Sequence, residues 1–374
     1  MIDPGLLCKA LQKRNIDFFA GVPDSLLKNF CAYIDDNGSP GKHVITANEG
    51  NAVALAAGYH LATGKTGAVY MQNSGLGNCV NPLTSLTDSE VYNIPVLLII
   101  GWRGEPGIKD EPQHIKQGRV TTGQLDLLEI PYQILDAQSD LETALNKLLT
   151  SENMSKGPVA LLIRKKTFSD YKRTKACPYD FTLRREQALS SILSLADQND
   201  LVVSTTGKTS RELFELRKSR SENQCDFLTV GSMGHTSSIA LGVALGRPHR
   251  RVLCIDGDGS FIMHMGSLPI IGSLKPSNFV HILLNNSAHE SVGGQETVAG
   301  AMDISKIVKA CGYKEYFQAG NTLEIEECWE RIKRLQGPVL LEIKVCLGSR
   351  DDLGRPDSTP IQNKQSFMEF CSAC

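Results

Sequence analysis

The sequence predicts an α/β protein made of two homologous, doubly wound domains, each with a mostly parallel sheet, and no middle domain. Apolar strand patterns alternate with helical patterns along both halves of the chain, an order typical of parallel sheets. The same succession of motifs also recurs at a nearly constant offset. The chain has 374 residues, which suits two domains of ordinary size.

Two comparisons within the chain indicate an internal duplication. The apolar segment 157–163 is echoed by 337–343, which begins 180 residues later. Gly75 and Gly259, which lie in two glycine-containing loops, are 184 residues apart. Short apolar matches alone are weak, but two agreeing offsets predict two copies of one domain.

Each predicted copy contains a helix of small residues, a buried strand and a glycine loop, in that order. In the first half we expect the helix over 51–62 and the strand over 68–72. In the second half we expect the helix over 236–245 and the strand over 252–255. Between the halves, a basic and polar stretch interrupts the apolar periodicity. The predicted domains are therefore 1–170 and 183–374, the latter with a C-terminal tail, joined by a solvated linker over 171–182.

The composition describes a globular protein, with 41% hydrophobic and 21% charged residues. A net charge of −2 does not suggest nucleic acid or an anionic membrane as a partner. The N-terminal residues do not resemble a secretory signal, and the longest apolar stretch is too short to cross a bilayer. Eleven cysteines, an odd number without a disulfide-like spacing, predict reduced thiols and a cytoplasmic location.

Two short polar motifs follow directly on predicted strands of the second half. The loop 257–260 has the sequence Gly-Asp-Gly-Ser and follows the apolar run 251–256. The pair 285–286 is Asn-Asn and follows the apolar run 279–284. Both loops should therefore lie at the carboxyl edge of a parallel sheet, where ligands bind in open α/β sheets.

The residue types in these loops suit a metal-bound diphosphate. Asp258 offers a carboxylate oxygen and Asn286 an amide oxygen, which are ligands that Mg²⁺ prefers. Gly257 and Gly259 allow backbone N–H groups to approach a phosphate closely. The alternative is two ordinary turns. A dinucleotide fingerprint fails because Ile262 stands where the third glycine is needed.

This constellation resembles the thiamine-diphosphate enzymes, in which Gly-Asp-Gly is followed some 25–30 residues later by Asn-Asn. The resemblance implies thiamine diphosphate and Mg²⁺ as cofactors. It implies Asp258, Asn286 and the backbone carbonyl of Ala288 as metal ligands, with Gly259 and Ser260 holding the diphosphate. The smallest members of the family have one domain for the aminopyrimidine ring and one for the diphosphate. Their cofactor lies between subunits, so a homodimer or homotetramer is expected.

Further cofactor contacts are expected in both halves. Glu49 begins the helix of small residues in the first half, and a carboxylate there could simply complement the helix dipole. The resemblance instead implies that Glu49 activates the cofactor by hydrogen bonding to its aminopyrimidine ring. Met233, which follows Gly231 in a glycine-rich loop, looks like the apolar wedge that bends the cofactor, although it could be a core methionine. Thr206, just before a helix, offers a hydroxyl to phosphate.

The likeness is strongest to the branch of this family that contains phosphonopyruvate decarboxylases, with sulfopyruvate decarboxylases as near relatives. It implies decarboxylation of 3-phosphonopyruvate to phosphonoacetaldehyde and CO₂, in phosphonate biosynthesis. Sulfopyruvate or another short 2-oxo acid is the alternative substrate. A non-catalytic thiamine-diphosphate-binding subunit is the alternative of another class, and Glu49 argues against it. The segments that carry the resemblance are 21–25, 71–78, 101–105, 111–114, 289–295 and 352–356.

Candidates for proton transfer and substrate binding come from the same segments. Asp24 and His114 resemble an Asp and His pair of related decarboxylases, although Asp24 could be a helix cap and His114 a surface residue. A dianionic phosphonate needs cationic or amide donors. Most basic residues in the loops should be solvated, and at most two should touch the substrate. The candidates for substrate contact are Asn73, Ser74, Arg103, Lys116 and Arg355, with Lys109, Arg119 and Arg350 as further basic residues.

Overall fold

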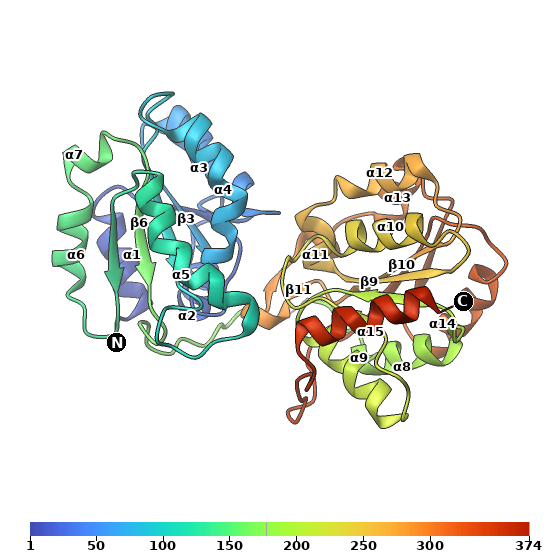
Figure 1. Ribbon diagram of the computed structural model, residues 1–374. Coiled ribbons are helices and arrows are strands. Elements are labelled where there is room, and N and C mark those ends of the chain that lie inside the picture. The colour runs from blue at the N-terminus through green and yellow to red at the C-terminus, as the bar shows by residue number, and fades with distance from the viewer. Residues whose placement is uncertain (177, 374) are drawn as a thin grey trace. The chain divides into compact units, whose positions relative to one another are not determined.

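The computed structural model describes residues 1–176 and 178–373 (Figure 1). These residues form two compact units. The first unit contains 1–176 together with 292–295, and the second contains the described residues of 178–291 and 296–373. Among the described residues, no helix combines the length and apolar character that a membrane crossing needs.

The first unit is built on a six-stranded sheet with the strand order β2-β1-β3-β4-β6-β5. Every neighbouring pair of strands is parallel. The strands are β1 (Phe18–Gly21), β2 (His43–Ile45), β3 (Gly67–Gln72), β4 (Val96–Gly101), β5 (Tyr132–Leu135) and β6 (Val159–Ile163).

Helices cover both faces of this sheet, so its central strands are buried on both sides. One hydrophobic cluster includes residues of α1, α2 and α6, and the other includes residues of α3, α4 and α5. The helices are α1 (Pro4–Gln12), α2 (Lys28–Asn37), α3 (Glu49–Thr63), α4 (Leu76–Pro82), α5 (Pro112–Leu127), α6 (Leu141–Leu148) and α7 (Ser151–Met154).

The second unit repeats this design. Its six-stranded sheet has the order β13-β14-β10-β9-β7-β8, again with parallel pairs throughout. The strands are β7 (Leu201–Ser204), β8 (Phe227–Leu228), β9 (Val252–Gly257), β10 (Phe279–Asn285), β13 (Glu315–Ala319) and β14 (Val339–Lys344), and two short strands, β11 (Ala288–His289) and β12 (Gln295–Glu296), pair outside the main sheet.

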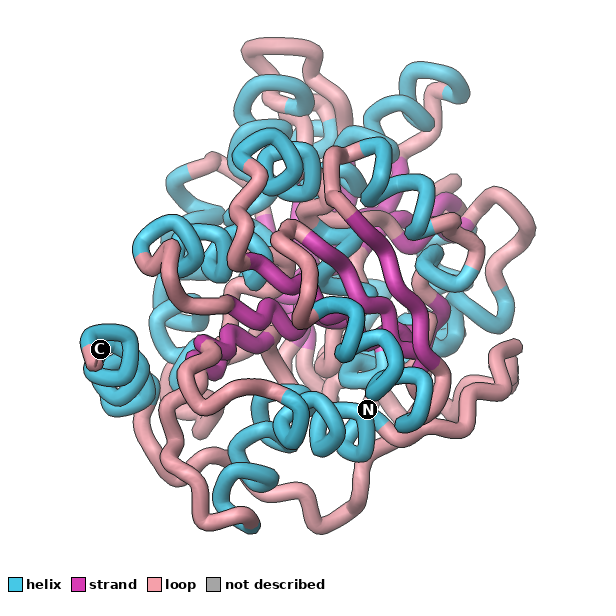
Figure 2. Tube along the Cα trace, turned by 90° about the vertical axis from the view of Figure 1, so that its right-hand side faces the viewer, coloured by secondary structure: helices cyan, strands magenta, loops and turns pink. Residues whose placement is uncertain are grey.

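Two hydrophobic clusters again cover the two faces of the sheet. One draws on α8, α9 and α14, and the other on α10, α11, α12, α13 and α15. Figure 2 shows the strands in magenta among the cyan helices. The helices are α8 (Arg185–Leu195), α9 (Lys208–Ser219), α10 (Thr236–Gly246), α11 (Asp258–Met263), α12 (Ser267–Leu274), α13 (Ile304–Ala310), α14 (Thr322–Ile332) and α15 (Pro360–Ser372).

The predicted fold class is confirmed. When the six strands of each main sheet are numbered from the first in that unit, both sheets have the order 2-1-3-4-6-5. The same order in two halves of one chain is the structural form of the duplication seen in the sequence. The predicted helices and strands lie within two residues of the observed ones. Helix α3 begins at Glu49, two residues earlier than expected, because Asn48 caps it by accepting a hydrogen bond from the backbone N–H of Asn51.

Candidate active site

Asp258 and Asn286 lie together at the carboxyl edge of the second sheet. Strand β9 runs directly into α11, which begins at Asp258, and β10 ends at Asn285. The N–H of Ala288 donates to Asn286 Oδ1 at 3.1 Å and also hydrogen bonds to the carboxylate of Asp258. Both side chains are buried. Oxygen atoms of the two predicted metal ligands therefore meet around one backbone N–H.

The carboxyl group of Asp258 is costly to ionise where it lies. Burial raises its pKa to about 6, although hydrogen bonds from Thr297 and from the backbone oppose this rise. The hydroxyl of Thr297 donates to Asp258 Oδ2 at 2.5 Å. A buried carboxylate with an amide oxygen beside it is a donor set that a divalent cation would stabilise.

Three segments of the second unit meet beside this pair: the two loops around Thr205 and Met233, and the junction of β9 with α11. A Cβ atom at Gly259 would lie 3.3 Å from Met233 Cε, so the methionine side chain packs against the glycine. The N–H of Gly234 donates to Ser260 Oγ at 3.1 Å. A Cβ atom at Gly257 would lie 3.9 Å from the side chain of Thr205. The predicted cofactor residues thus belong to three neighbouring segments, and the predicted loop 257–260 is instead the end of β9 followed directly by the first turn of α11. They are Thr206, Gly231, Met233, Gly257, Gly259 and Ser260.

The carboxyl group of Glu49 is held at the amino end of α3 in the first unit. Its side chain is buried, and Asn78 Nδ2 donates to Oε2 at 2.7 Å. Gly75 lies so close that a Cβ atom there would come within 2.5 Å of the Glu49 carboxyl group. The loop after β3 therefore leaves room for Glu49 only because residue 75 has no side chain.

Asp24 and His114 share the guanidinium group of Arg103 as a charged neighbour. Asp24 is buried, and burial raises its pKa to about 6, although Arg103 and backbone N–H groups oppose the rise. His114 is buried on α5, and burial together with Arg103 lowers its pKa. Asp24 Oδ1 and His114 Nδ1 are buried atoms that have no hydrogen-bond partner among the described residues. Two titratable groups with perturbed pKa values in one place are typical of a functional site.

Arg103 itself is tied to the loop that follows β4. Its Nε donates to Asp110 Oδ2 at 2.8 Å, its Nη2 also donates to Asp110, and its Nη1 donates to Ser25 Oγ at 2.8 Å. A cavity of about 210 Å³ lies here. Its lining includes Ser25, Trp102, Arg103, Asp110 and Lys165. Lys165 was not expected at this place from the sequence, because it follows β6 and the other lining residues come from earlier loops.

The remaining residues that were predicted to contact the substrate differ in their burial and in their partners. Asn73 is fully buried, and its amide hydrogen bonds to the backbone of Arg103 and to Thr121. Ser74 is exposed and accepts a hydrogen bond from Gln72. Lys109, Lys116, Arg119 and Arg355 are exposed, and Arg350 forms ion pairs with Glu186, Glu215 and Asp352. Their contacts with a substrate stay predictions.

Two residues beside the paired ligands escaped the sequence reasoning. Thr297 is 39 positions from Asp258, and no local pattern relates the two. Glu290 accepts a hydrogen bond from Asn286 Nδ2 at 2.8 Å. Its position within the segment 289–295, which carries part of the family resemblance, was the only available signal.

Comparison with known families agrees with this architecture. A family model described as "Thiamine pyrophosphate enzyme, N-terminal TPP binding domain" matches residues 5–127, and one described as "Thiamine pyrophosphate enzyme, C-terminal TPP binding domain" matches residues 205–343. Together with the two sheets of identical order, these matches define the class as the thiamine pyrophosphate enzymes.

Similar proteins narrow the class. Phosphonopyruvate decarboxylase from Streptomyces viridochromogenes is 35% identical, over 99% of this chain and 95% of that protein. The protein of the same name from Streptomyces hygroscopicus is 34% identical, over 100% and 94%. Sulfopyruvate decarboxylase from Methanosarcina acetivorans is 27% identical, over 87% of each chain. The chain belongs to the phosphonopyruvate decarboxylase family of thiamine pyrophosphate enzymes.

Proposed function

We propose that the protein is a thiamine-diphosphate- and Mg²⁺-dependent decarboxylase that converts 3-phosphonopyruvate into phosphonoacetaldehyde and CO₂. One observation carries the proposal. The oxygen atoms of Asp258 and Asn286 converge at the Ala288 N–H, in a chain that is 35% identical over almost its full length to a phosphonopyruvate decarboxylase.

Each unit has its own part in holding the cofactor. Asp258, Asn286 and the carbonyl of Ala288 bind Mg²⁺. The loops around Thr206 and Gly231, together with the junction of β9 and α11 at 257–260, hold the diphosphate. Met233 supports the bent form of the cofactor. Domain 1–170 binds the aminopyrimidine ring and domain 183–374 the diphosphate, with 171–182 as the linker. The active protein is a homodimer or homotetramer whose sites lie between subunits.

The chain's own residues supply acid, base and position. When bound, thiamine diphosphate supplies the carbon nucleophile and accepts the electron pair that is released with CO₂. Glu49 shares a proton with the aminopyrimidine ring, and Asn78 holds its carboxyl group in place. Asp24 keeps its proton up to about pH 6 because burial raises its pKa. Asp24 can therefore donate that proton to the species that remains after CO₂ has left. His114 is its partner in this proton transfer.

The phosphonate group is bound from the loops of the first unit and from the C-terminal segment. Asn73, Ser74, Arg103, Lys116 and Arg355 are the proposed contacts. Arg103 has the best support, because it lines the cavity beside Asp24. A phosphonate dianion in this cavity would accept hydrogen bonds from the guanidinium group of Arg103, which also donates to Asp110.

The proposed setting is phosphonate biosynthesis in the cytoplasm. Irreversible loss of CO₂ would draw forward the preceding, unfavourable formation of a carbon–phosphorus bond. The described cysteines are free thiols, several of them buried, which suits a reducing compartment.

Turnover of three substrates tests the function. The purified protein, supplied with thiamine diphosphate and Mg²⁺, should release CO₂ and an aldehyde from phosphonopyruvate with a higher kcat/KM than from sulfopyruvate or pyruvate. The second candidate, sulfopyruvate decarboxylation, is supported by the similarity to the Methanosarcina acetivorans enzyme and would reverse that order. Cofactor binding without CO₂ release from any of the three would favour the non-catalytic subunit.

A further inference from the structure

The amide of Asn286 is oriented by a carboxylate four residues later. Asn286 Nδ2 donates to Glu290 Oε2 at 2.8 Å, while Asn286 Oδ1 accepts from the Ala288 N–H at 3.1 Å. An ionised carboxylate only accepts hydrogen bonds, so it can face only the NH₂ end of an amide. The contact with Glu290 therefore determines that the oxygen of Asn286 is the end beside Ala288 and Asp258.

Two cationic side chains of the second unit lie against the carboxylate of Glu290. Arg185 Nη1 lies 2.8 Å from Oε2, and Lys208 Nζ lies 2.8 Å from Oε1. Each carboxylate oxygen of Glu290 therefore has a cationic partner. The oxygen that accepts from Asn286, Oε2, is the one that Arg185 also contacts.

Arg185 has a second carboxylate partner. Its Nε and Nη2 donate to the two oxygens of Glu212 at 2.7 and 2.8 Å, and both side chains are buried. This bidentate pair already neutralises the charge of Arg185. Glu290 is therefore an additional carboxylate that joins the Arg185–Glu212 pair and Lys208 to the side chain of Asn286.

We propose that Glu290 is a positioning residue for the divalent-cation site, acting by holding Asn286 with its Oδ1 toward the cation that Asp258 also binds. The inference rests on the proposed function, because it requires Mg²⁺ at Asp258 and Asn286. Partners that orient a metal ligand in this way typically contribute tenfold to a hundredfold to metal affinity.

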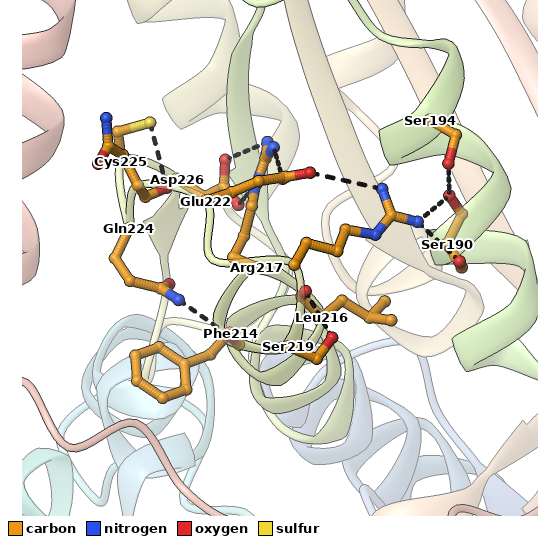
Figure 3. Close-up of polar contacts among 12 residues, drawn as sticks. Ser190, Ser194, Phe214, Leu216, Arg217, Ser219, Glu222, Gln224, Cys225 and Asp226 are labelled. Carbon is orange, nitrogen blue, oxygen red and sulfur yellow. Dashed lines mark hydrogen bonds and ion pairs between the residues drawn. The ribbon is translucent and has the colours of Figure 1, made fainter.

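The second unit contains a similar arrangement that provides a control (Figure 3). Arg217 Nε and Nη2 each donate to Asp226 at 2.9 Å, and Arg217 Nη1 donates to Glu222 Oε2 at 2.6 Å. Arg217 lies nine residues beyond Lys208 on α9, which is on the order of 14 Å along the helix. Glu222 is the second carboxylate partner of Arg217, as Glu290 is of Arg185. Replacing Glu222 therefore removes an equivalent contact from a part of the unit that is remote from Asn286.

The experiment compares Glu290→Gln and Glu290→Asp with the wild type and with Glu222→Gln. Glutamine removes the charge at almost the same shape, and aspartate keeps the charge but withdraws it from Asn286 by one methylene. Protein freed of metal with a chelator and saturated with thiamine diphosphate is titrated with Mg²⁺ in a calorimeter. Thermal unfolding without Mg²⁺ checks the fold of each variant.

We expect both Glu290 variants to bind Mg²⁺ about tenfold or more weakly, with kcat recovering at saturating Mg²⁺. Glu222→Gln should bind Mg²⁺ within about threefold of the wild type, because it is remote from the ligands. If Glu290→Gln fails to fold, Glu290→Asp decides the matter, since it retains the charge. Folded Glu290 variants with the wild-type Mg²⁺ affinity would overturn the inference. A wild type that binds neither Mg²⁺ nor thiamine diphosphate would overturn the proposed function instead.

Discussion

Thr297 donates a hydrogen bond of 2.5 Å to Oδ2 of Asp258 across 39 positions of the chain. Both residues are buried. Hydrogen bonds to an ionised group are among the stronger ones in proteins, and this one leaves the second oxygen of the carboxylate to other partners. The hydroxyl of Thr297 thus orients the carboxylate that we propose as a Mg²⁺ ligand.

Thr297→Val should weaken Mg²⁺ binding, because valine keeps the shape of threonine but cannot donate to Asp258. We expect a loss of roughly tenfold in Mg²⁺ affinity, as for other partners of metal ligands. Calorimetric titration in the presence of thiamine diphosphate measures it. Thr236→Val is the control, since Thr236 is buried but its Oγ1 has no hydrogen-bond partner within the part of the chain that the structure describes. An equal loss in both variants would contradict the role of Thr297.

Glu49→Gln should separate cofactor binding from turnover. The amide can still accept the hydrogen bond from Asn78, but it cannot share a proton with the aminopyrimidine ring. We expect kcat to fall by roughly 10²-fold or more, with the affinity for thiamine diphosphate within about threefold of the wild type. Steady-state kinetics and calorimetry measure the two quantities. A variant with nearly normal kcat would remove Glu49 from its proposed role.

Gly75→Ala should impair the same step through packing. The added methyl group would come within 2.5 Å of the Glu49 carboxyl group, so Glu49 must shift. Small displacements of a catalytic group can cost on the order of 10²-fold in rate, and we expect kcat to fall toward this figure.

Gly77→Ala is the matched control for that substitution, because a Cβ atom at Gly77 would meet no atom of residues 1–176 or 178–373 within 4 Å. It should leave kcat unchanged and stabilise α4 by up to about 1 kcal/mol. The measurements are kcat and the free energy of unfolding of both variants. Equal effects on kcat at the two positions would exclude contact with Glu49 as the cause.

Asp24 should make the free energy of unfolding depend on pH. Its pKa is raised from 3.8 to about 6 in the folded protein, mainly by burial, so the folded state binds the proton more tightly than the unfolded state. This contribution to stability is fully present below about pH 4 and is lost as the pH rises through about 6. Its size is about 3 kcal/mol for a shift of about two units.

The side chain of asparagine cannot ionise, so the Asp24→Asn variant should not lose stability in this way as the pH rises. The free energy of unfolding of the wild type, relative to the variant, should therefore decrease by about 3 kcal/mol from pH 3 to pH 7. Denaturant titrations at several pH values measure the difference. A difference that stays constant or increases with pH would contradict the burial of an ionisable Asp24.

The sequence by itself determined the fold and brought together the two loops that contain Asp258 and Asn286. Strand runs and helix patterns are local, and the carboxyl ends of neighbouring parallel strands always meet at one edge of the sheet. The meeting of the loops that contain Asp258 and Asn286 therefore followed from the order of elements. Glu49 was different, because its position at the start of a helix of small residues is equally that of a capping acid, and only the family resemblance implied a role at the cofactor.

Only the tertiary structure decided which side chains orient these groups. The contacts of Thr297 with Asp258 and of Asp110 with Arg103 depend on the paths of loops, which no periodic pattern sets. The same holds for Asn73, whose amide is buried against Arg103 and Thr121, and for Glu290, which joins Arg185 to Asn286. The physical reason is the separation along the chain of the residues that interact. Helices and strands arise from residues that are close in sequence, whereas a buried polar group pairs with whichever segment the fold brings within hydrogen-bond distance.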